Sequence, residues 1–145
     1  MENSLSISVI IATLNRADSL EEALASLVRQ VRQPDEVVVV DNGSTDNTKE
    51  IALSFRDRLN IKYVYEGQRG IPYARNAGVR NATKDVVAFI DDDCIAHKNW
   101  LKHLEIPFIK DPHVGVVGGE VCHLKTGEGI VDEFHTRNMP EVPLE

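Results

Sequence analysis

The chain has 145 residues, of which 42% are hydrophobic and 27% are charged, as is usual for a single soluble globular domain. Its formal net charge of −7 provides no basic field, so we expect neither a nucleic acid nor an anionic membrane surface as a partner. Phosphate groups would have to be bound locally, by a metal ion, a helix N-terminus or a few placed arginines.

The cysteines and the hydropathy pattern bear on the compartment. Cys94 and Cys122 show no metal-binding spacing, which favours two free thiols in a reducing compartment. The first residues lack the basic region of a secretory signal, and no apolar run approaches the length that spans a membrane. These features predict a cytoplasmic location and no membrane segment in this chain.

Apolar runs and helical spacings alternate along the chain. A β-branched run predicts a buried strand at residues 6–13, and apolar residues at helical spacing predict a helix at 19–31. Asp18 and Glu21 have the spacing of an N-terminal capping box for that helix. The elements expected next, in chain order, are a strand at 36–40, a helix from about 44 to 55, a strand at 61–65, a helix from 72 to 82, a strand at 86–90, a helix at 99–109 and a strand at 114–117. This alternation predicts an α/β fold, with a mostly parallel central sheet and helices on both faces.

Three carboxylates, Asp91, Asp92 and Asp93, directly follow the apolar run 86–90, which is typical of a strand buried on both faces. Such acids repel one another strongly unless a cation lies among them. Oxygen ligands suit Mg²⁺ or Mn²⁺, ions that commonly share their coordination with substrate phosphates. The cluster therefore predicts a metal–phosphate site, and the alternative is an acidic turn that faces water.

Ligands of open parallel sheets bind in the crevice beyond the carboxyl ends of the strands. Polar clusters follow the predicted strands at that edge, namely Thr13-Leu14-Asn15-Arg16, Asp41-Asn42-Gly43-Ser44, residues 66–70 and the acidic triplet. Together they can bind a base, a ribose and a metal-bridged diphosphate. The GxxxxGK[ST] loop and a GxGxxG after the first strand are both absent, which argues against a P-loop NTPase and a dinucleotide-binding Rossmann domain.

Four motifs, SVIIATLNR, VVVVDNGSTDNT, GIPYARNAGV and VVAFIDDDC, occur in that order. In residues 6–94, and more loosely to 121, the chain resembles the nucleotide-binding half of a family 2 glycosyltransferase. The resemblance implies an inverting enzyme with the Rossmann-like GT-A fold, truncated here at its C-terminal side. It implies that residues 1–125 bind the nucleotide-sugar donor and that residues 126–145 are an incomplete acceptor-side segment or tail.

The resemblance also implies partners and a location. Family members often build cell-surface polysaccharides at the cytoplasmic face of a membrane, with the anchor elsewhere. We therefore expect a nucleotide-diphosphate sugar, most often a UDP-sugar, as donor and a saccharide or lipid-linked acceptor. The full-length protein would then work in the cytoplasm, at the membrane face.

The resemblance implies a nucleotide-binding role for five residues outside the acidic triplet. Thr13, Asn15 and Arg16 would lie against the nucleoside. Asp41 would accept the N3–H of the base, typically uracil, and Arg75 would approach the nucleotide. From the residues alone, each keeps a simpler alternative: Asp41 as a helix cap, Arg75 as a solvated helix residue, and Asn15-Arg16 as a turn.

The acidic triplet matches the family's D-x-D motif. Asp93, together with Asp91, would bind the Mn²⁺ or Mg²⁺ ion that bridges the two phosphates, while Asp91 or Asp92 would contact the ribose or the sugar. The metal would neutralise the departing diphosphate as an acceptor hydroxyl attacks the anomeric carbon and gives its proton to a carboxylate base. The family's base lies in a later segment, which we expect beyond residue 145, and Glu120 is not taken as the base.

Two functions of other kinds stay open at this point. A non-catalytic nucleotide-sugar binding module would carry the same donor site and lack only the base. A phosphotransferase with an aspartate nucleophile would use Asp91 and Asp93, although such enzymes usually carry that pair after the first strand, not after a later one.

Overall fold

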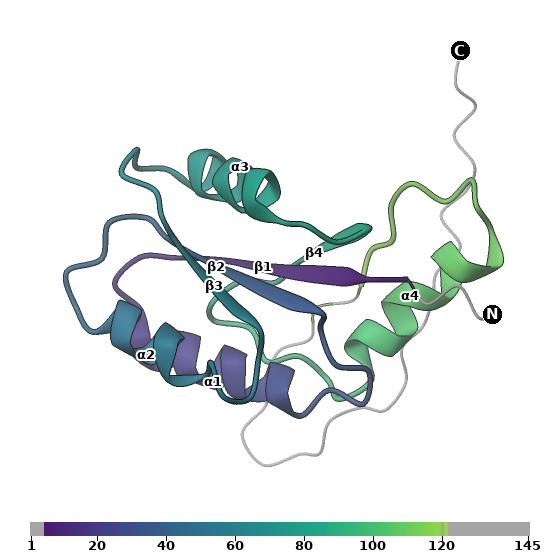
Figure 1. Ribbon diagram of the computed structural model, residues 1–145, viewed down its shortest axis with the longest axis horizontal. Coiled ribbons are helices and arrows are strands. Elements are labelled where there is room, and N and C mark those ends of the chain that lie inside the picture. The colour runs from purple at the N-terminus through teal and green to yellow at the C-terminus, as the bar shows by residue number, and fades with distance from the viewer. Residues whose placement is uncertain (1–4, 120, 122–145) are drawn as a thin grey trace.

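The computed structural model describes residues 5–119 and 121. Four parallel strands form one sheet in the order β3-β2-β1-β4. The strands are β1 (Ile7–Thr13), β2 (Glu36–Asp41), β3 (Ile61–Tyr65) and β4 (Val86–Phe89). The helices are α1 (Ala17–Val28), α2 (Thr48–Ser54), α3 (Ile71–Asn81) and α4 (Trp100–Lys110). The predicted parallel α/β fold is confirmed (Figure 1).

Helices cover both faces of the sheet (Figure 1). Alternate side chains of β1 and β2, such as Val9 and Val39, pack with α1, α2 and α4. The side chains between them, such as Ile10 and Val38, pack beneath α3 against Ala74. Because both sides of the central strands are buried, these strands are continuous apolar runs in the sequence. Burial of each such side chain contributes about 1.5–3 kcal/mol.

The helix α3 approaches the sheet closely at Gly78. A Cβ atom at that position would lie 2.4 Å from Cγ2 of Ile10, which is itself 1% exposed. No side chain fits at that distance without a shift of the helix or of β1. Glycine therefore sets the spacing between the sheet and the helix that carries Arg75.

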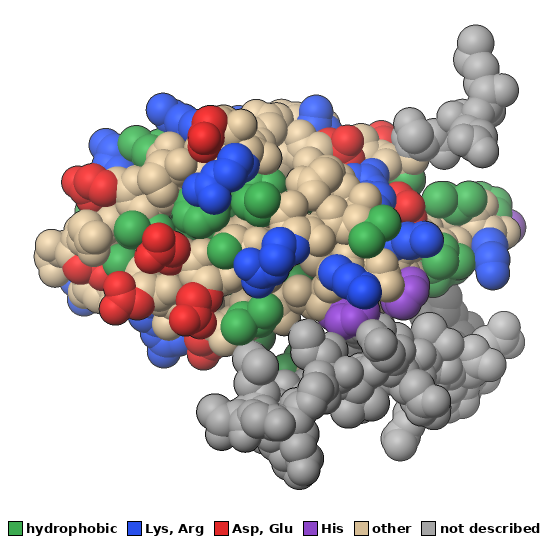
Figure 2. Space-filling model, turned by 90° about the horizontal axis from the view of Figure 1, so that it is seen from below, with side chains coloured by type: hydrophobic (Ala, Val, Ile, Leu, Met, Phe, Trp, Pro, Cys, Tyr) green, Lys and Arg blue, Asp and Glu red, His purple; other side chains and the backbone are tan. Residues whose placement is uncertain are grey.

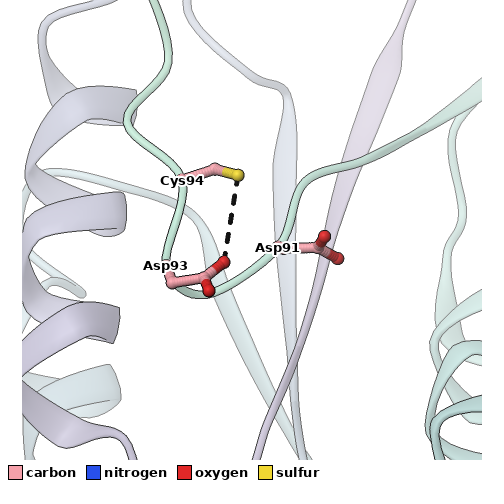
Figure 3. Close-up of side chains that lie close together, drawn as sticks. All are labelled: Asp91, Asp93 and Cys94. Atoms are coloured by element: carbon pink, nitrogen blue, oxygen red, sulfur yellow. Dashed lines mark hydrogen bonds between the residues drawn. The ribbon is translucent and has the colours of Figure 1, made fainter. Parts of the chain in front are cut away.

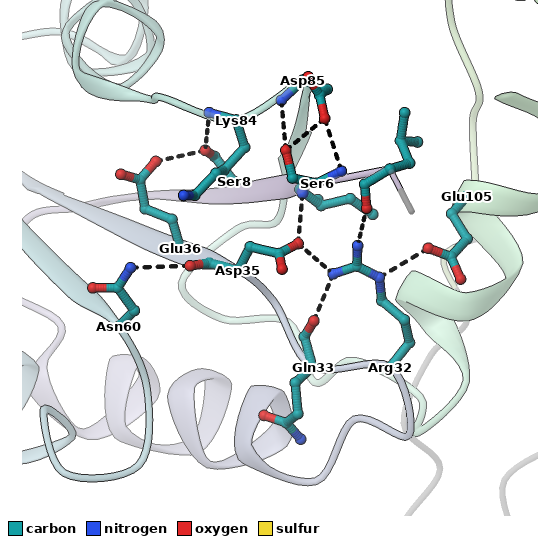
Figure 4. Close-up of polar contacts among 12 residues, drawn as sticks. Ser6, Ser8, Arg32, Gln33, Asp35, Glu36, Asn60, Lys84, Asp85 and Glu105 are labelled. Carbon is teal, nitrogen blue, oxygen red and sulfur yellow. Dashed lines mark hydrogen bonds and ion pairs between the residues drawn. The ribbon is translucent and has the colours of Figure 1, made fainter. Parts of the chain in front are cut away.

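A polar network joins the amino ends of the strands, at the edge opposite the crevice (Figure 4). Arg32 donates from Nε to Glu105 of α4 (2.9 Å) and from Nη1 to Asp35 (2.7 Å), and its Nη2 donates to the carbonyl of Leu5. The Asp35 carboxylate also accepts the backbone N–H of Ile7 at 2.8 Å. These contacts tie α4 to the starts of β1 and β2.

Glu36, at the start of β2, is the buried carboxylate of this edge. Its oxygens accept hydrogen bonds from Ser8 Oγ (2.5 Å) and from the backbone N–H and the hydroxyl of Thr83 (both 3.0 Å). Burial alone would raise the pKa of Glu36, but these hydrogen bonds outweigh it and hold the pKa below its usual value. The carboxylate therefore links β1, β2 and the chain before β4 in its ionised form.

The first two helices begin at residues other than the predicted ones. α1 begins at Ala17, so Asp18 lies inside the first turn and the predicted capping box with Glu21 does not form. Instead, Asp46 Oδ2 accepts the Ala17 N–H (3.2 Å). Oδ1 of the same carboxylate accepts the N–H (3.1 Å) and the hydroxyl (2.5 Å) of Thr48, where α2 begins. One aspartate in the loop between β2 and α2 thus accepts hydrogen bonds from the starts of both helices.

Two predictions about strands are wrong. Residues 114–117 form no strand in the part of the chain that the structure describes, because none of the described strands pairs with them, and Val116 is 88% exposed. The run 86–90 is not buried on both faces: Val87 is 36% exposed and Phe89 is 46% exposed. The reason is that β4 is the edge strand of the described sheet, and α3 packs over β1 and β2.

The face of the molecule that lies below in Figure 1 is shown in Figure 2. Acidic and basic side chains are interspersed there among the described residues. Across the described residues, none of the helices combines the length and the apolar character that crossing a membrane requires.

Candidate functional site

A cleft of about 410 Å³ opens beyond the carboxyl ends of β1 and β4, beside the first turn of α3. Its polar lining consists of Thr13, Arg16, Asn42, Arg75, Asp91, Asp92 and Asp93. Its apolar lining includes Ile10, Ala12, Ile71, Ala74 and Phe89. The structure thus brings together most of the residues that the sequence assigns to the donor site. Two of them, Asn15 and Asp41, do not line this cleft.

Two arginines lie among the three carboxylates of the triplet. Arg75 Nη2 lies 3.1 Å from Oδ1 of Asp91. Arg16 Nη1 lies 3.2 Å from Oδ2 of Asp93 and 3.3 Å from Oδ1 of Asp92. The side chains of Asp91 and Asp93 are 65% and 57% exposed, whereas that of Asp92 is 9% exposed. The cations that three adjacent acids require are therefore supplied here by the protein's own guanidinium groups.

The exposed carboxylates of the triplet also fit a divalent cation. One ligand atom from each of Asp91, Asp93 and Cys94 lies within 4.8 Å of the others (Figure 3). Carboxylate oxygens suit Mg²⁺ and Mn²⁺, and the exposure of both acids leaves room for water or phosphate oxygens as further ligands. Cys94 fits such an ion poorly, because burial and the nearby Asp93 raise the pKa of its soft thiol.

Thr13, the last residue of β1, offers an unpaired polar atom beside the cleft. The residue is 3% exposed, and its Oγ1 finds no hydrogen-bond partner among the described residues. A buried hydroxyl without a partner costs about 1–3 kcal/mol. A ligand group that reached this oxygen would recover part of that energy. The place of Thr13 against a nucleoside stays a prediction.

Asp41 closes β2 and shapes the turn that follows it. Its Oδ1 accepts the N–H groups of Gly43 (3.1 Å) and Ser44 (2.7 Å), and its Oδ2 accepts the Tyr63 hydroxyl (2.7 Å). Burial and this last bond raise the pKa of Tyr63, so its hydroxyl stays protonated. Asp41 caps no helix, because α2 begins only at Thr48. A carboxylate has about four acceptor positions, which leaves one on Oδ2 for a ligand N–H.

Asn15 joins the loops that follow β1 and β2. Its φ of 52° is in the left-handed region, which asparagine tolerates better than most residues. Its backbone N–H donates to Ser44 Oγ (2.9 Å), and its Oδ1 accepts the N–H of Thr45 (2.7 Å). In this structure Asn15 therefore holds the loop from which Arg16 reaches the acids.

Asn42 lines the cleft and is a site residue that the sequence reasoning did not single out. Its Nδ2 donates to the carbonyls of Glu66 (2.9 Å) and Gln68 (2.8 Å), and its Oδ1 accepts the N–H of Gly70 (2.8 Å). Gly70, with a φ of 134°, directly precedes α3. Asn42 thus ties the end of β2 to the helix that carries Arg75. Its partners are distant backbone groups, which leave no signal in the sequence.

The apolar lining of the cleft was also missed. Ile71 and Phe89 are 63% and 46% exposed although both are large and hydrophobic. In the sequence they look like ordinary core positions of a helix and a strand. Glu120, Cys122, the tail 126–145 and the expected position of a catalytic base all lie outside the described residues.

Comparisons with known proteins identify the family of the chain. The model of the family described as glycosyl transferase family 2 matches residues 8–131. Validoxylamine A glucosyltransferase of Streptomyces hygroscopicus subsp. limoneus is 41% identical over 100 residues, which cover 66% of this chain and 22% of that protein. The structure of S. aureus TarS in complex with UDP-GlcNAc matches with a TM-score of 0.63 and 35% identity. The match covers 73% of this chain and 31% of the TarS chain.

A further solved structure is the mannosyltransferase PcManGT from Pyrobaculum calidifontis in complex with GDP-Man and Mn²⁺. It matches with a TM-score of 0.68 and 32% identity, and the match covers 77% of this chain and 34% of the PcManGT chain. This chain therefore spans between about a fifth and a third of the length of these proteins. The matches confirm the Rossmann-like GT-A fold and give no support to an aspartate-nucleophile phosphotransferase. The chain belongs to glycosyl transferase family 2.

Proposed function

We propose that this chain is the donor-binding part of an inverting, metal-dependent glycosyltransferase that uses a nucleotide-diphosphate sugar, with UDP as the nucleotide. The observation that carries the proposal is the cleft at the carboxyl ends of the strands, where three acids and two arginines meet. Among solved relatives, TarS is seen with UDP-GlcNAc and PcManGT with GDP-Man and Mn²⁺, which supports a nucleotide sugar as the ligand.

We assign a role to each of these predicted binding residues, including Asp41, which lies outside the cleft lining. Thr13 and Arg16 face the nucleoside from the end of β1, and the open acceptor position of Asp41 receives the N3–H of uracil. Arg75 approaches the diphosphate from α3. Asp92, nearly buried, keeps Arg16 in place.

Asp91 and Asp93 hold the divalent cation, which supplies Lewis-acid neutralisation of the charge on the leaving diphosphate. Their exposure lets them face the phosphates directly. The acceptor hydroxyl, of a saccharide or a lipid-linked saccharide, then attacks the anomeric carbon from the face opposite the leaving group, and a carboxylate base takes its proton. We place the base and most of the acceptor site outside the described residues, and the enzyme at the cytoplasmic face of a membrane.

Calorimetric titration of UDP into the chain, with and without Mn²⁺, tests this function. We expect UDP binding to depend on the metal, and the UDP affinity to fall at least about tenfold in Asp93→Ala. The reason is that the loss of even a residue that only orients a metal ligand lowers metal affinity about 10- to 100-fold. Asp57→Ala, which removes a 78% exposed carboxylate far from the triplet in the sequence, is the matched control and should bind as the wild type does. GDP, titrated in the same way, tests the choice of uracil.

The outcomes separate two claims. Metal-dependent binding of GDP in preference to UDP would contradict the assignment of uracil and leave the transferase site standing. A well-folded sample that binds neither nucleotide with metal would overturn the donor-binding function of this chain.

A further inference from the structure

We propose that Arg16 and Arg75 occupy the place of the metal in the nucleotide-free protein, and that both release the metal-binding carboxylates when the cation binds, Arg75 then pairing with the diphosphate. The cation and the nucleotide would then bind as a coupled pair, each weakly without the other. This inference rests on the function proposed above, and it concerns how the site is regulated.

The geometry places the two arginines in direct competition with the cation. Arg75 pairs with Asp91 at 3.1 Å and Arg16 pairs with Asp93 at 3.2 Å. Asp91 and Asp93 are also the two carboxylates whose oxygens cluster closely enough to share one ion. An ion that approached those oxygens would meet guanidinium groups of the same sign. Metal binding therefore requires that both pairs loosen.

The charges of the cluster favour binding of both ligands over either one. Three carboxylates and two guanidinium groups leave the cluster with one net negative charge. A divalent cation alone would make it positive by one, and a sugar-linked diphosphate, with about two negative charges, would alone make it negative by three. The two together leave the charge unchanged. Each ligand bound alone thus leaves a net charge that attracts the other, so electrostatics favours the doubly bound state.

The two arginines can move because their pairs are exposed. The side chains of Arg16 and Arg75 are 55% and 49% exposed, and each contacts the acids through only one nitrogen. Exposed pairs of this kind are weak and break readily. Asp92 is 9% exposed, so Arg16 is expected to keep that partner and release only Asp93. Arg75 has no such tie and is the arginine that leaves fully.

The metal alone provides the first test. Mn²⁺ is titrated into the nucleotide-free chain and free Mn²⁺ is followed by its electron paramagnetic resonance signal. We expect Arg75→Gln to bind Mn²⁺ about two- to fivefold more tightly than the wild type, which is the size of an exposed ion pair. Arg80→Gln, on the same helix but paired with Glu66 at 3.6 Å, removes the same charge and should change the affinity much less. Arg75→Lys, which keeps the charge, should lie between the wild type and Arg75→Gln.

The second test measures coupling through UDP affinity with and without Mn²⁺. The factor by which Mn²⁺ strengthens UDP binding should fall about two- to fivefold in Arg75→Gln and stay near the wild-type value in Arg80→Gln. Unchanged Mn²⁺ affinity in Arg75→Gln, or an equal gain in Arg80→Gln, would overturn the exchange while UDP binding by the wild type still upheld the donor site. A wild type that binds no nucleotide would overturn the proposed function, and the exchange with it.

Discussion

Asn42→Asp is the substitution that most directly tests how the cleft is held in shape. The change keeps the size of the side chain and the oxygen that accepts the Gly70 N–H at 2.8 Å. It replaces the amide that donates to the carbonyls of Glu66 and Gln68, so a carboxylate oxygen then faces two carbonyl oxygens. The loop between those residues is exposed, so water can take over part of the lost bonding. The two lost hydrogen bonds cost about 1 kcal/mol each; rebonding to water lowers this cost and the repulsion between the oxygens raises it. We therefore expect the free energy of unfolding to fall by about 1–3 kcal/mol.

Urea unfolding of the chain measures this loss. With a urea slope of about 1–3 kcal/mol per M, the midpoint of Asn42→Asp should fall by roughly 1 M. Asn60→Asp is the control, since the exposed Asn60 donates one hydrogen bond of 3.0 Å and its loss should cost under about 1 kcal/mol. Equal midpoints for Asn42→Asp and the wild type would refute the view that this amide anchors the loop before α3.

Two further predictions concern the packing and the buried carboxylate. Gly78→Ala should lower the free energy of unfolding by about 1–3 kcal/mol despite alanine's better helix propensity, because its Cβ meets Ile10; a more stable variant in urea would contradict this. The pKa of Glu36 is lower in the folded protein than its usual value near 4.5, so its contribution is complete above about pH 5 and is lost as pH falls through the folded pKa. Urea unfolding between pH 7 and pH 3.5 should therefore show a shallower loss of stability in Glu36→Gln than in the wild type, with the exposed Glu22→Gln as the control for net charge; equal slopes would speak against it.

The sequence alone predicts the four described strands and the four helices to within a few residues. The patterns succeed there because β1 and β2 are buried on both faces and the apolar stripes of the helices match their burial. They also predict which end of the sheet carries the site, since parallel strands bring their carboxyl ends to one edge. Of the predicted binding residues, Thr13, Arg16, Arg75 and the acids meet in one cleft.

The errors arise where a long-range contact overrides a local signal. The apolar run 114–117 has the composition of a strand, but a strand also needs a paired neighbour, and none of the described strands pairs with it. Asp18 and Glu21 have the spacing of a capping box, yet the carboxylate of Asp46, 29 residues from Ala17, bonds the first turn of α1. Asn42 was overlooked for the same reason, since its three partners lie at least 24 residues away.

The chain uses arginine–carboxylate pairs in two different ways, and the difference is physical. At the amino ends of the strands, Arg32 is 17% exposed and uses all three of its nitrogens on acceptors from three segments, so it acts as a fixed brace. At the carboxyl ends, Arg16 and Arg75 are about half exposed and touch the acids through single nitrogens at 3.1–3.3 Å. A guanidinium group with one weak contact and open solvent beside it can change partners at little cost, whereas the brace cannot. On the proposal above, the amino ends of the sheet serve stability and its carboxyl ends serve the response to ligands.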